Sequence, residues 1–328
     1  MKEGLSMKNK SWFEALHPQT DHHWGIILAG GNGTRLQQYV KTRFGEFRPK
    51  QYCALIGRRS MLRHTIDRIS RLFSLDHLLT TISAQHLSWA FGDLHDRPPG
   101  TVVIQPMNRE TGPGILLPLL HVHSADPKGI VGLFPADHFI LQEEQYRSFV
   151  TQAYGFAAEH PGTIVMLGIA PSSLQFGYGW IEKGERMLTE EISSVKKFWE
   201  KPDARLMQYL HEKKCLWNTM TLIGTTETFL QLLEEHMRDV FVASQRIVSS
   251  LGTTFEADVT EDVFRKLPSV NFSRSVLEKV PHKLGVLQMN GIYWNDWGDE
   301  SRIQADLDIL EHDAEPVVSE HVLDRSEE

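Results

Sequence analysis

The chain has 328 residues, of which 41% are hydrophobic and 23% charged, a balance typical of a globular protein with a sizeable core. Two cysteines are too few for a disulfide framework or a zinc cluster, and no apolar run is long enough to span a membrane. The net charge is −8, and residues 311–328 hold seven acids against one Arg, so the sequence has no broad basic surface for nucleic acid.

The two ends of the chain differ from its middle. The first 23 residues contain no apolar segment of the kind found in secretory signals, so we expect an N-terminal extension over 1–23 and a cytoplasmic location. The acids of 311–328 predict a solvated tail. The part between them, 24–310, is expected to form one large domain.

Runs that favour strands alternate with helix-like periodicity through the first half of this domain. Strands are predicted at 25–29, 78–82, 101–105, 129–134 and 163–169, and helices at 61–73, 114–124 and 143–159. From about residue 171 the strands at 177–182 and 195–199 are expected to be antiparallel, followed by helices at 204–213, 226–238 and within 239–251. The pattern predicts an α/β fold, a Rossmann-like and mainly parallel sheet flanked by helices, with a smaller lobe over about 171–300.

A glycine-rich turn follows the first predicted strand, with Gly30, Gly31 and Gly33 in four positions. Such a turn lets the backbone approach a ligand closely and point successive N–H groups at an anion. From Arg35 to Lys50 the chain holds five Lys or Arg against one Glu. Together these features predict a polyphosphate site, and a tight turn beside a solvated charged face is the simpler alternative.

Two familiar phosphate-binding patterns do not fit this turn. Both the P-loop and the dinucleotide pattern require a glycine five residues after their first glycine, whereas this chain has Leu36 five residues after Gly31. A P-loop and an NAD site are therefore disfavoured.

Polar residues also follow other predicted strands. Gln105 and Asn108 follow the strand at 101–105, and Asp137 follows the strand at 129–134. Because the carboxyl ends of parallel strands meet at one edge of a sheet, these residues and the glycine turn are expected to share one site. An acid at such an edge can bind Mg²⁺, and Asp296, between two Trp residues, is a second candidate. A helix cap or turn is the alternative role for either acid.

The runs LAGGNGTRL at 28–36 and RPKQ at 48–51 resemble the signature of the sugar-1-phosphate nucleotidylyltransferases, above all the mannose-1-phosphate guanylyltransferases. The resemblance implies that the glycine loop wraps a nucleoside triphosphate whose phosphates Arg35 and Lys50 neutralise. It also implies that Asp137 and Asp296 share one Mg²⁺, with Asp299 as a less favoured substitute. His138 is expected to orient a turn, because a sugar phosphate needs no base to activate it.

Further motifs extend this resemblance over roughly residues 24–300. The run at 105–113 resembles a stretch that lines the base and ribose pocket, and the runs at 177–182, 199–202 and 217–220 resemble the GYGYI, VEKP and W-N-S-G-M motifs of the sugar side. The implied nucleotide contacts are Leu28, Ala29, Gly30, Gly31, Gly33, Thr34, Gln105, Asn108, Arg109, Thr111 and Pro113, with Thr111 also a candidate helix cap. The implied sugar-phosphate contacts are Asp137, Gly179, Glu182, Glu200, Lys201 and Asn218.

The chain departs from these motifs at several positions. Gln105 stands where the family has Glu, glycines flank Pro113 in place of alanines, the glycine expected after Thr219 is missing, and Ser273 replaces an Asp. These differences leave the identity of the base and the sugar as expectations from the resemblance alone.

The resemblance thus implies an enzyme that transfers a nucleotidyl group from a nucleoside triphosphate to a sugar-1-phosphate and releases pyrophosphate. GTP and mannose-1-phosphate, giving GDP-mannose, are the leading pair. The alternatives are a sibling transferase that uses another pair of substrates and a non-catalytic paralogue that binds nucleotide-sugars. Nucleic acid and membranes are not expected partners, and a homodimer stays open.

Overall fold

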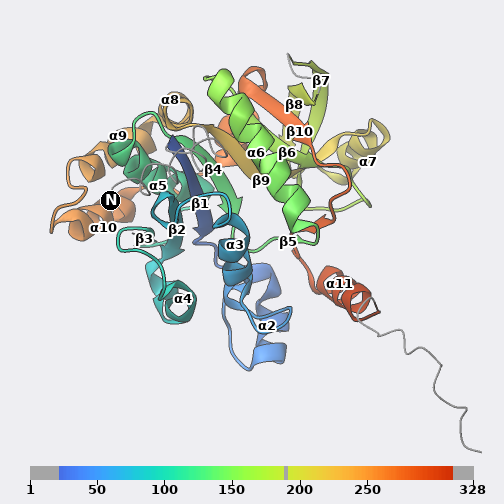
Figure 1. Cartoon of the computed structure of the whole chain (residues 1–328), viewed down its shortest axis with the longest axis horizontal. Helices are drawn as coiled ribbons and strands as arrows, with labels where there is room; N and C mark the ends of the chain where they lie inside the picture. Colours follow the sequence, from blue (N-terminus) through green and yellow to red (C-terminus); the bar gives the residue numbers. More distant parts are fainter. Residues whose placement is uncertain (1–21, 188–190, 313–328) are drawn as a thin grey trace, which may run out of the picture.

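A nine-stranded sheet forms the centre of the computed structural model, which describes residues 22–187 and 191–312. Its strands are β1 (His23–Ala29), β2 (Leu78–Ser83), β3 (Val102–Gln105), β4 (Ile130–Pro135), β6 (Ile164–Ile169), β7 (Gly179–Arg186), β8 (Ile192–Glu200), β9 (Leu216–Thr225) and β10 (Leu284–Gln288). They lie in the order β3-β2-β1-β4-β9-β6-β10-β8-β7, with helices on both sides of the sheet (Figure 1).

The first four strands are parallel, as the sequence predicts. β1 pairs with both β2 and β4, and β2 pairs with β3. In this register Leu28 lies opposite Pro135, and Ser83 lies opposite Gln105. The carboxyl ends of all four strands therefore meet at one edge, which is where ligands of such sheets bind.

The other half of the sheet is mixed, so the expectation of a mainly parallel sheet holds only for the first half. β9 runs antiparallel to both β4 and β6, and β8 runs antiparallel to β7 and β10. The antiparallel direction of β9 follows from where this strand begins. Trp217 lies opposite Ile169, so the chain leaves β6, forms the small lobe and re-enters the sheet at the same edge.

Helices cover both faces of the sheet. They are α2 (Gln37–Phe44), α3 (Met61–Ile69), α4 (Leu87–Leu94), α5 (Thr111–Ala125), α6 (Glu143–Glu159), α7 (Ala204–Glu212), α8 (Thr226–His236), α9 (Arg238–Val248), α10 (Glu256–Lys266) and α11 (Glu300–His312). Alternation along β1 separates two cores. Ile26 packs in the core formed with α5 and α8–α10, and Ile27 packs in the core formed with α3 and α6.

A third, smaller core joins segments that are far apart in the chain. Leu36 and Val40 of the region after the glycine turn pack with Trp297 and with Ile303 of α11. Burying these side chains fixes the C-terminal helix beside the glycine turn. The two motifs that the sequence associates with phosphate and metal are thereby brought to the same part of the molecule.

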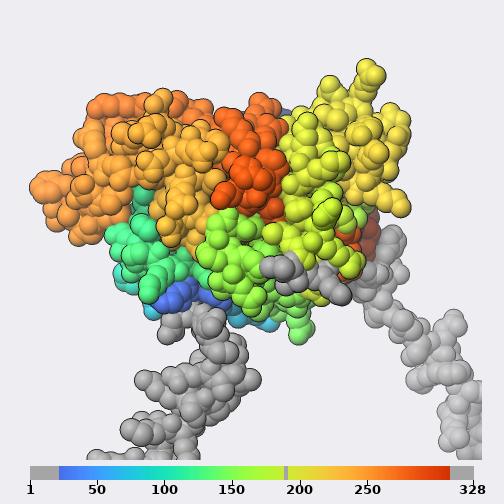
Figure 2. Space-filling view, turned by 90° about the horizontal axis from the view of Figure 1, so that it is seen from above, coloured from blue at the N-terminus to red at the C-terminus, as the bar shows by residue number. Residues whose placement is uncertain are grey.

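The sides of the molecule are built from different parts of the sequence. In Figure 2 the orange helices α9 and α10 form one flank and the yellow residues of α7 form the other, with the darker orange part that contains β10 between them. Among the described residues, every helix is too short or too polar to cross a bilayer. The predicted extension over 1–23 and tail over 311–328 fall almost entirely outside the described residues.

Candidate active site

The glycine turn and the second cationic motif lie against each other. Gly33 has a φ of 59°, and a Cβ added there would lie 3.1 Å from the backbone nitrogen of Lys50. The Gln51 side chain donates to the carbonyl oxygens of Ala29 (2.9 Å) and Gly31 (2.7 Å). Only a residue without Cβ suits this left-handed and crowded position, and Gln51 holds the turn in place from the other side.

A cavity of about 300 Å³ opens at the carboxyl ends of the parallel strands. Such a volume lies at the lower end of the range of small-molecule sites. Its walls consist of Leu28, Gly30, Gly31, Thr81, Gln105, Asn108, Glu110, Thr111, Gly114, Ile115, Pro135, His138 and Met220. Six of the eleven predicted nucleotide contacts are in this wall: Leu28, Gly30, Gly31, Gln105, Asn108 and Thr111.

Gln105 and Thr81 are the buried polar residues of this wall, with 3% and 1% of their surfaces exposed. A Cβ on Gly30 would lie 2.4 Å from the Gln105 amide nitrogen, and one on Gly114 would lie 3.2 Å from its amide oxygen. The glycines at both positions therefore make room for this side chain. The replacement of alanine by glycine at 114 is explained by the contact with Gln105.

Other predicted nucleotide contacts have different positions. Arg109 donates to the carbonyl oxygens of Phe264 (2.9 Å) and Arg265 (2.8 Å) at the end of α10, so its guanidinium is not part of the cavity wall. Thr111 does not cap α5, because its hydroxyl accepts from the backbone N–H of Phe272 instead (2.8 Å). Pro113 is buried within α5, while Ala29 and Thr34 belong to the backbone on either side of the glycines.

The two candidate metal-binding acids come together through a pair of very short strands. β5 (Phe139–Ile140) follows Asp137, and β11 (Trp294–Asn295) precedes Asp296. These strands pair antiparallel, which brings the two motifs side by side although the sequence separates them widely.

Lys50 lies between the two acids. Its Nζ is 3.1 Å from Oδ2 of Asp137 and donates to the backbone carbonyls of Asp296 and Trp297. The Lys50 side chain is only 5% exposed. Burial opposes ionisation of Asp137, but Lys50, His138 and Arg35 together outweigh it and hold the pKa of this carboxyl below its usual value. The pair is thus charged on both sides.

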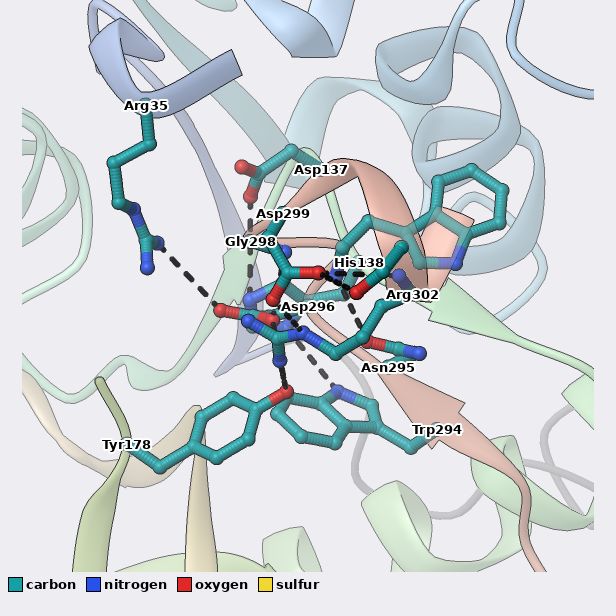
Figure 3. A network of polar contacts seen from close by, with 12 residues as sticks. Arg35, Asp137, His138, Tyr178, Trp294, Asn295, Asp296, Gly298, Asp299 and Arg302 are labelled. Carbon is teal, nitrogen blue, oxygen red and sulfur yellow. Dashed lines mark hydrogen bonds and ion pairs between the residues drawn. The ribbon is translucent and has the colours of Figure 1, made fainter. Parts of the chain in front are cut away.

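One carboxylate oxygen of Asp296 accepts hydrogen bonds from three neighbouring groups, and the other faces Arg35, which follows the glycine turn. Oδ1 accepts from the Tyr178 hydroxyl (2.8 Å), from Arg302 Nη1 (2.7 Å) and from the Gly298 N–H (3.0 Å). Oδ2 faces the guanidinium of Arg35 at 3.7 Å. Figure 3 shows Arg35 approaching Asp296 from one side and Tyr178 and Arg302 from the other.

The donor set at this position suits a hard cation that completes its coordination elsewhere. Among residues 22–187 and 191–312 no group of three or more His, Cys, Asp or Glu side chains could hold a metal ion without help. Asp137 and Asp296 supply two carboxylates. Mg²⁺ typically binds one or two carboxylates together with substrate phosphates and water, so these two residues fit it and not a tightly held structural metal.

His138 has a structural environment. The indole N–H of Trp294 donates to its Nδ1 (3.3 Å), and the two rings meet edge to face. Burial, only partly opposed by Asp137, lowers the pKa of His138 to about 4. A neutral imidazole that accepts the Trp294 hydrogen bond agrees with the expected role in orienting the turn.

Several of the predicted sugar-phosphate contacts lie close together. A Cβ on Gly179 would lie 3.2 Å from Oε2 of Glu200 and 3.3 Å from Cβ of Asn218, so both residues lie beside Gly179. Lys201 pairs with Glu200 at 3.3 Å. Burial raises the pKa of Glu200, while Lys201 opposes that change.

Glu182 lies on the other face of the sheet. Along β7, Trp180 packs in the α3 and α6 core whereas Ile181 packs in the α5 core, so Glu182 points to the side of Trp180 and away from Gly179. Its carboxylate pairs with Lys196 (2.8 Å). The two-residue periodicity of a strand would have indicated this placement from the sequence.

Arg302 and Asp306 of α11 were not recognised from the sequence as parts of the site, and Asp299 was considered only as a substitute metal ligand. Asp299 accepts from the backbone N–H of Arg302 (3.1 Å), so it caps the helix. Arg302 binds both Asp299 and Asp296. Asp306, 2% exposed, accepts hydrogen bonds from Tyr293, Asn295 and Trp297. An Asp three residues before an Arg at a helix start is the signal that the sequence offers.

Known proteins resemble this chain over most of its length. A family model described as nucleotidyl transferase matches residues 24–311. The mannose-1-phosphate guanylyltransferase of Salmonella muenchen is 29% identical over 286 residues, which are 85% of this chain and 58% of that protein. The enzyme of the same name from Escherichia coli is 28% identical over 281 residues, 83% of this chain and 59% of that protein. The chain thus spans less than two thirds of the length of these relatives.

Solved structures share the fold. The structure described as mannose-1-phosphate geranyltransferase from Thermus thermophilus has a TM-score of 0.74 at 22% identity, covering 87% of this chain and 79% of that one. UDP-glucose pyrophosphorylase complexed with UDP-glucose has a TM-score of 0.52 at 15% identity, covering 88% of this chain and 99% of that one. Since the family model extends over residues 24–311, the chain belongs to the nucleotidyl transferase family.

Proposed function

We propose that this chain transfers a nucleotidyl group from a nucleoside triphosphate to a sugar-1-phosphate and releases pyrophosphate. GTP and mannose-1-phosphate are the pair we propose first, because several relatives carry the name mannose-1-phosphate guanylyltransferase. The observation that carries the proposal is the convergence of Lys50, Asp137 and Asp296 beside the glycine turn and the cavity.

In the proposed reaction a phosphate oxygen of the sugar phosphate attacks the α-phosphorus of the triphosphate. A new P–O bond forms as the bond to the pyrophosphate oxygen breaks, and pyrophosphate leaves with its negative charge. The nucleophile is already an anion, so no general base is required. The neutral, hydrogen-bonded His138 agrees with this scheme.

The protein's contribution is positioning and charge neutralisation. The N–H groups of the glycine turn would face the phosphates, and Arg35, 61% exposed at its mouth, is free to turn towards them. Lys50 is rigidly held and would meet the charge that develops near Asp137. We propose that Asp137 and Asp296 hold Mg²⁺, which when bound supplies positive charge to the phosphate oxygens.

The sugar phosphate would lie towards the small lobe. Glu200 and Asn218 lie beside Gly179 there, and the adjacent Lys201 side chain is 49% exposed. We propose that Lys201 binds the phosphate of the sugar phosphate and that Glu200 binds a hydroxyl group. Glu182 and Arg109 are not included, since their side chains are engaged elsewhere.

A substrate matrix tests the proposal. The purified protein is incubated with Mg²⁺, each common nucleoside triphosphate and a panel of sugar-1-phosphates, and pyrophosphate release is measured. Turnover of GTP with mannose-1-phosphate is expected, and turnover of a different pair would favour the sibling transferase. Binding of GTP without turnover of any pair would favour the non-catalytic paralogue.

Two lysine variants connect the activity to the site. Lys50→Met removes the buried cation and is expected to lower kcat on the order of 10²–10³-fold. Lys41→Met is the matched control, because Lys41 belongs to the same basic stretch but is exposed and lies over the Phe47 ring. A folded Lys50→Met protein with turnover close to that of the control would contradict the assignment.

A further inference from the structure

Met220 has a backbone conformation that residues with a side chain rarely adopt. Its φ is 55°, in the left-handed region where a Cβ is unfavourable. Asn218 stabilises this conformation, since its Oδ1 accepts from the Met220 N–H (3.0 Å). The Met220 side chain then forms part of the cavity wall.

The thioether sulfur of Met220 accepts hydrogen bonds from two buried polar side chains. Nδ2 of Asn218 donates to its sulfur at 3.2 Å, and the hydroxyl of Ser273 donates to it at 3.5 Å. Asn218 and Ser273 are 4% and 3% exposed, and neither lines the cavity, whereas Met220 does. Met220 therefore separates these two polar groups from any molecule in the cavity.

The position of Asn218 indicates which ligand contact this separation prevents. Asn218 lies beside Gly179, next to which Phe198 and Glu200 also lie, so it belongs to the group proposed to surround the sugar. A buried amide there would read a sugar hydroxyl, and sites built in that way strongly reject analogues that lack it. Here Oδ1 of the amide accepts from the Met220 N–H and Nδ2 donates to its sulfur, so the cavity wall at this point is a thioether, a weak acceptor and not a donor, in place of the amide.

We propose that Met220 is a specificity-determining residue that makes the site insensitive to one hydroxyl group of the sugar-1-phosphate. The substrate class is then wider than one hydroxylated sugar, since the sugar phosphate and its deoxy analogue at that ring position are accepted alike. This inference rests on the proposed function and refines its sugar specificity.

The test compares mannose-1-phosphate with its monodeoxy analogues, using the full chain with GTP and Mg²⁺. In the wild-type protein one analogue is expected to have a kcat/KM within about twofold of the parent sugar, since no hydrogen bond is lost. Met220→Gly suits the backbone conformation and releases Nδ2 of Asn218 from the sulfur, while Oδ1 keeps its bond to the backbone N–H at position 220. In this variant the same analogue is expected to fall about tenfold behind the parent sugar, which is the effect of one hydrogen bond.

Two further variants separate selectivity from stability. Met220→Ala also removes the thioether and should shift the ratio in the same direction, so the test does not depend on one protein folding. Lys214→Gly is the matched control: Lys214 also has a left-handed φ (54°) but does not line the cavity, so its substitution should leave the ratio unchanged. Thermal unfolding verifies that each variant is folded.

The outcomes distinguish this inference from the proposed function. If folded Met220→Gly and Met220→Ala proteins keep the wild-type ratio, or if the wild-type protein rejects every deoxy analogue about tenfold or more, the inference is wrong. If the wild-type protein releases no pyrophosphate with any pair, the proposed function fails. Calorimetric binding of the same sugar phosphates then decides the inference, and equal ratios in wild type and variants, or no binding, overturn it.

Discussion

Replacing Asp306 by Ala is expected to destabilise the protein strongly. The carboxylate is 2% exposed and accepts hydrogen bonds from Tyr293 (2.5 Å), Asn295 (3.0 Å) and Trp297 (2.6 Å). Trp297 is completely buried and Asn295 is 8% exposed, whereas Tyr293 is 38% exposed and can bond to water instead. Two buried donors would thus lose their acceptor at about 1–3 kcal/mol each. Relief of the buried charge offsets part of this loss, so we expect about 3 kcal/mol.

Chemical denaturation measures this loss, with Asp308→Ala as the matched control. Asp308 is on the same helix but is exposed and, among the described residues, accepts only from Gln304 (2.7 Å), so its removal should change the free energy of unfolding by less than about 0.5 kcal/mol. Activity should fall with Asp306→Ala as well, because Asn295 and Trp297 flank Asp296. A loss below about 1 kcal/mol would refute the reasoning, since two stranded buried donors cannot cost so little.

Three other predictions follow from the site and its surroundings. Gly33→Ala should lower the free energy of unfolding, measured with denaturant, by about 1–2 kcal/mol, because Gly33 has a left-handed φ and a Cβ there would crowd the Lys50 backbone. Gly31→Ala should not lower it, because a Cβ at Gly31 meets open space among the described residues. Arg302→Met should lower kcat about 10–100-fold with unchanged GTP affinity, since Arg302 orients Asp296; rescue by Lys would argue for charge alone. Burial lowers the pKa of His86 and His121. As pH falls below about 6.5, these histidines bind protons in the unfolded chain before they do so in the folded protein, so the free energy of unfolding decreases. His121→Gln should make this decrease smaller, which melting temperatures measured over a range of pH would show.

The strong periodic elements could be predicted from the sequence. Residues 143–159 coincide with α6, and the strands before Gly30 and Asp137 end where the apolar runs end. Periodicity succeeds there because a long stripe or a continuous buried run has few alternatives. It gives no information on β5 and β11, which have two residues each and form only because the segments around them already meet. The pairing of Asp137 with Asp296 therefore came from a family resemblance and not from the residues.

The residues that were assigned by motif position alone show a different limit. Glu182 is next to Ile181 in a sugar motif, yet it points to the opposite face of β7 because successive side chains alternate. Arg109 is inside the nucleotide motif, but its guanidinium finds the free carbonyls at the end of α10, a helix encoded far downstream. Motif position identifies a segment, whereas the direction of each side chain depends on elements that the motif does not contain.

The charges of the site suggest when a metal would enter it. Asp137 is paired with Lys50, and Asp296 with Arg302 and Arg35, so within the described residues each candidate metal ligand already has a cation as partner. A divalent ion alone would have to compete with these pairs. A triphosphate brings negative charge that attracts the exposed Arg35 away from Asp296, shares the charge of Lys50 with Asp137 and offers oxygens of its own. We therefore expect weak Mn²⁺ binding in equilibrium titrations without nucleotide and at least tenfold tighter binding with GTP, as a coupling of about 1.4 kcal/mol requires. Equal Mn²⁺ affinity in both titrations would show that the ion pairs do not control access to the two carboxylates.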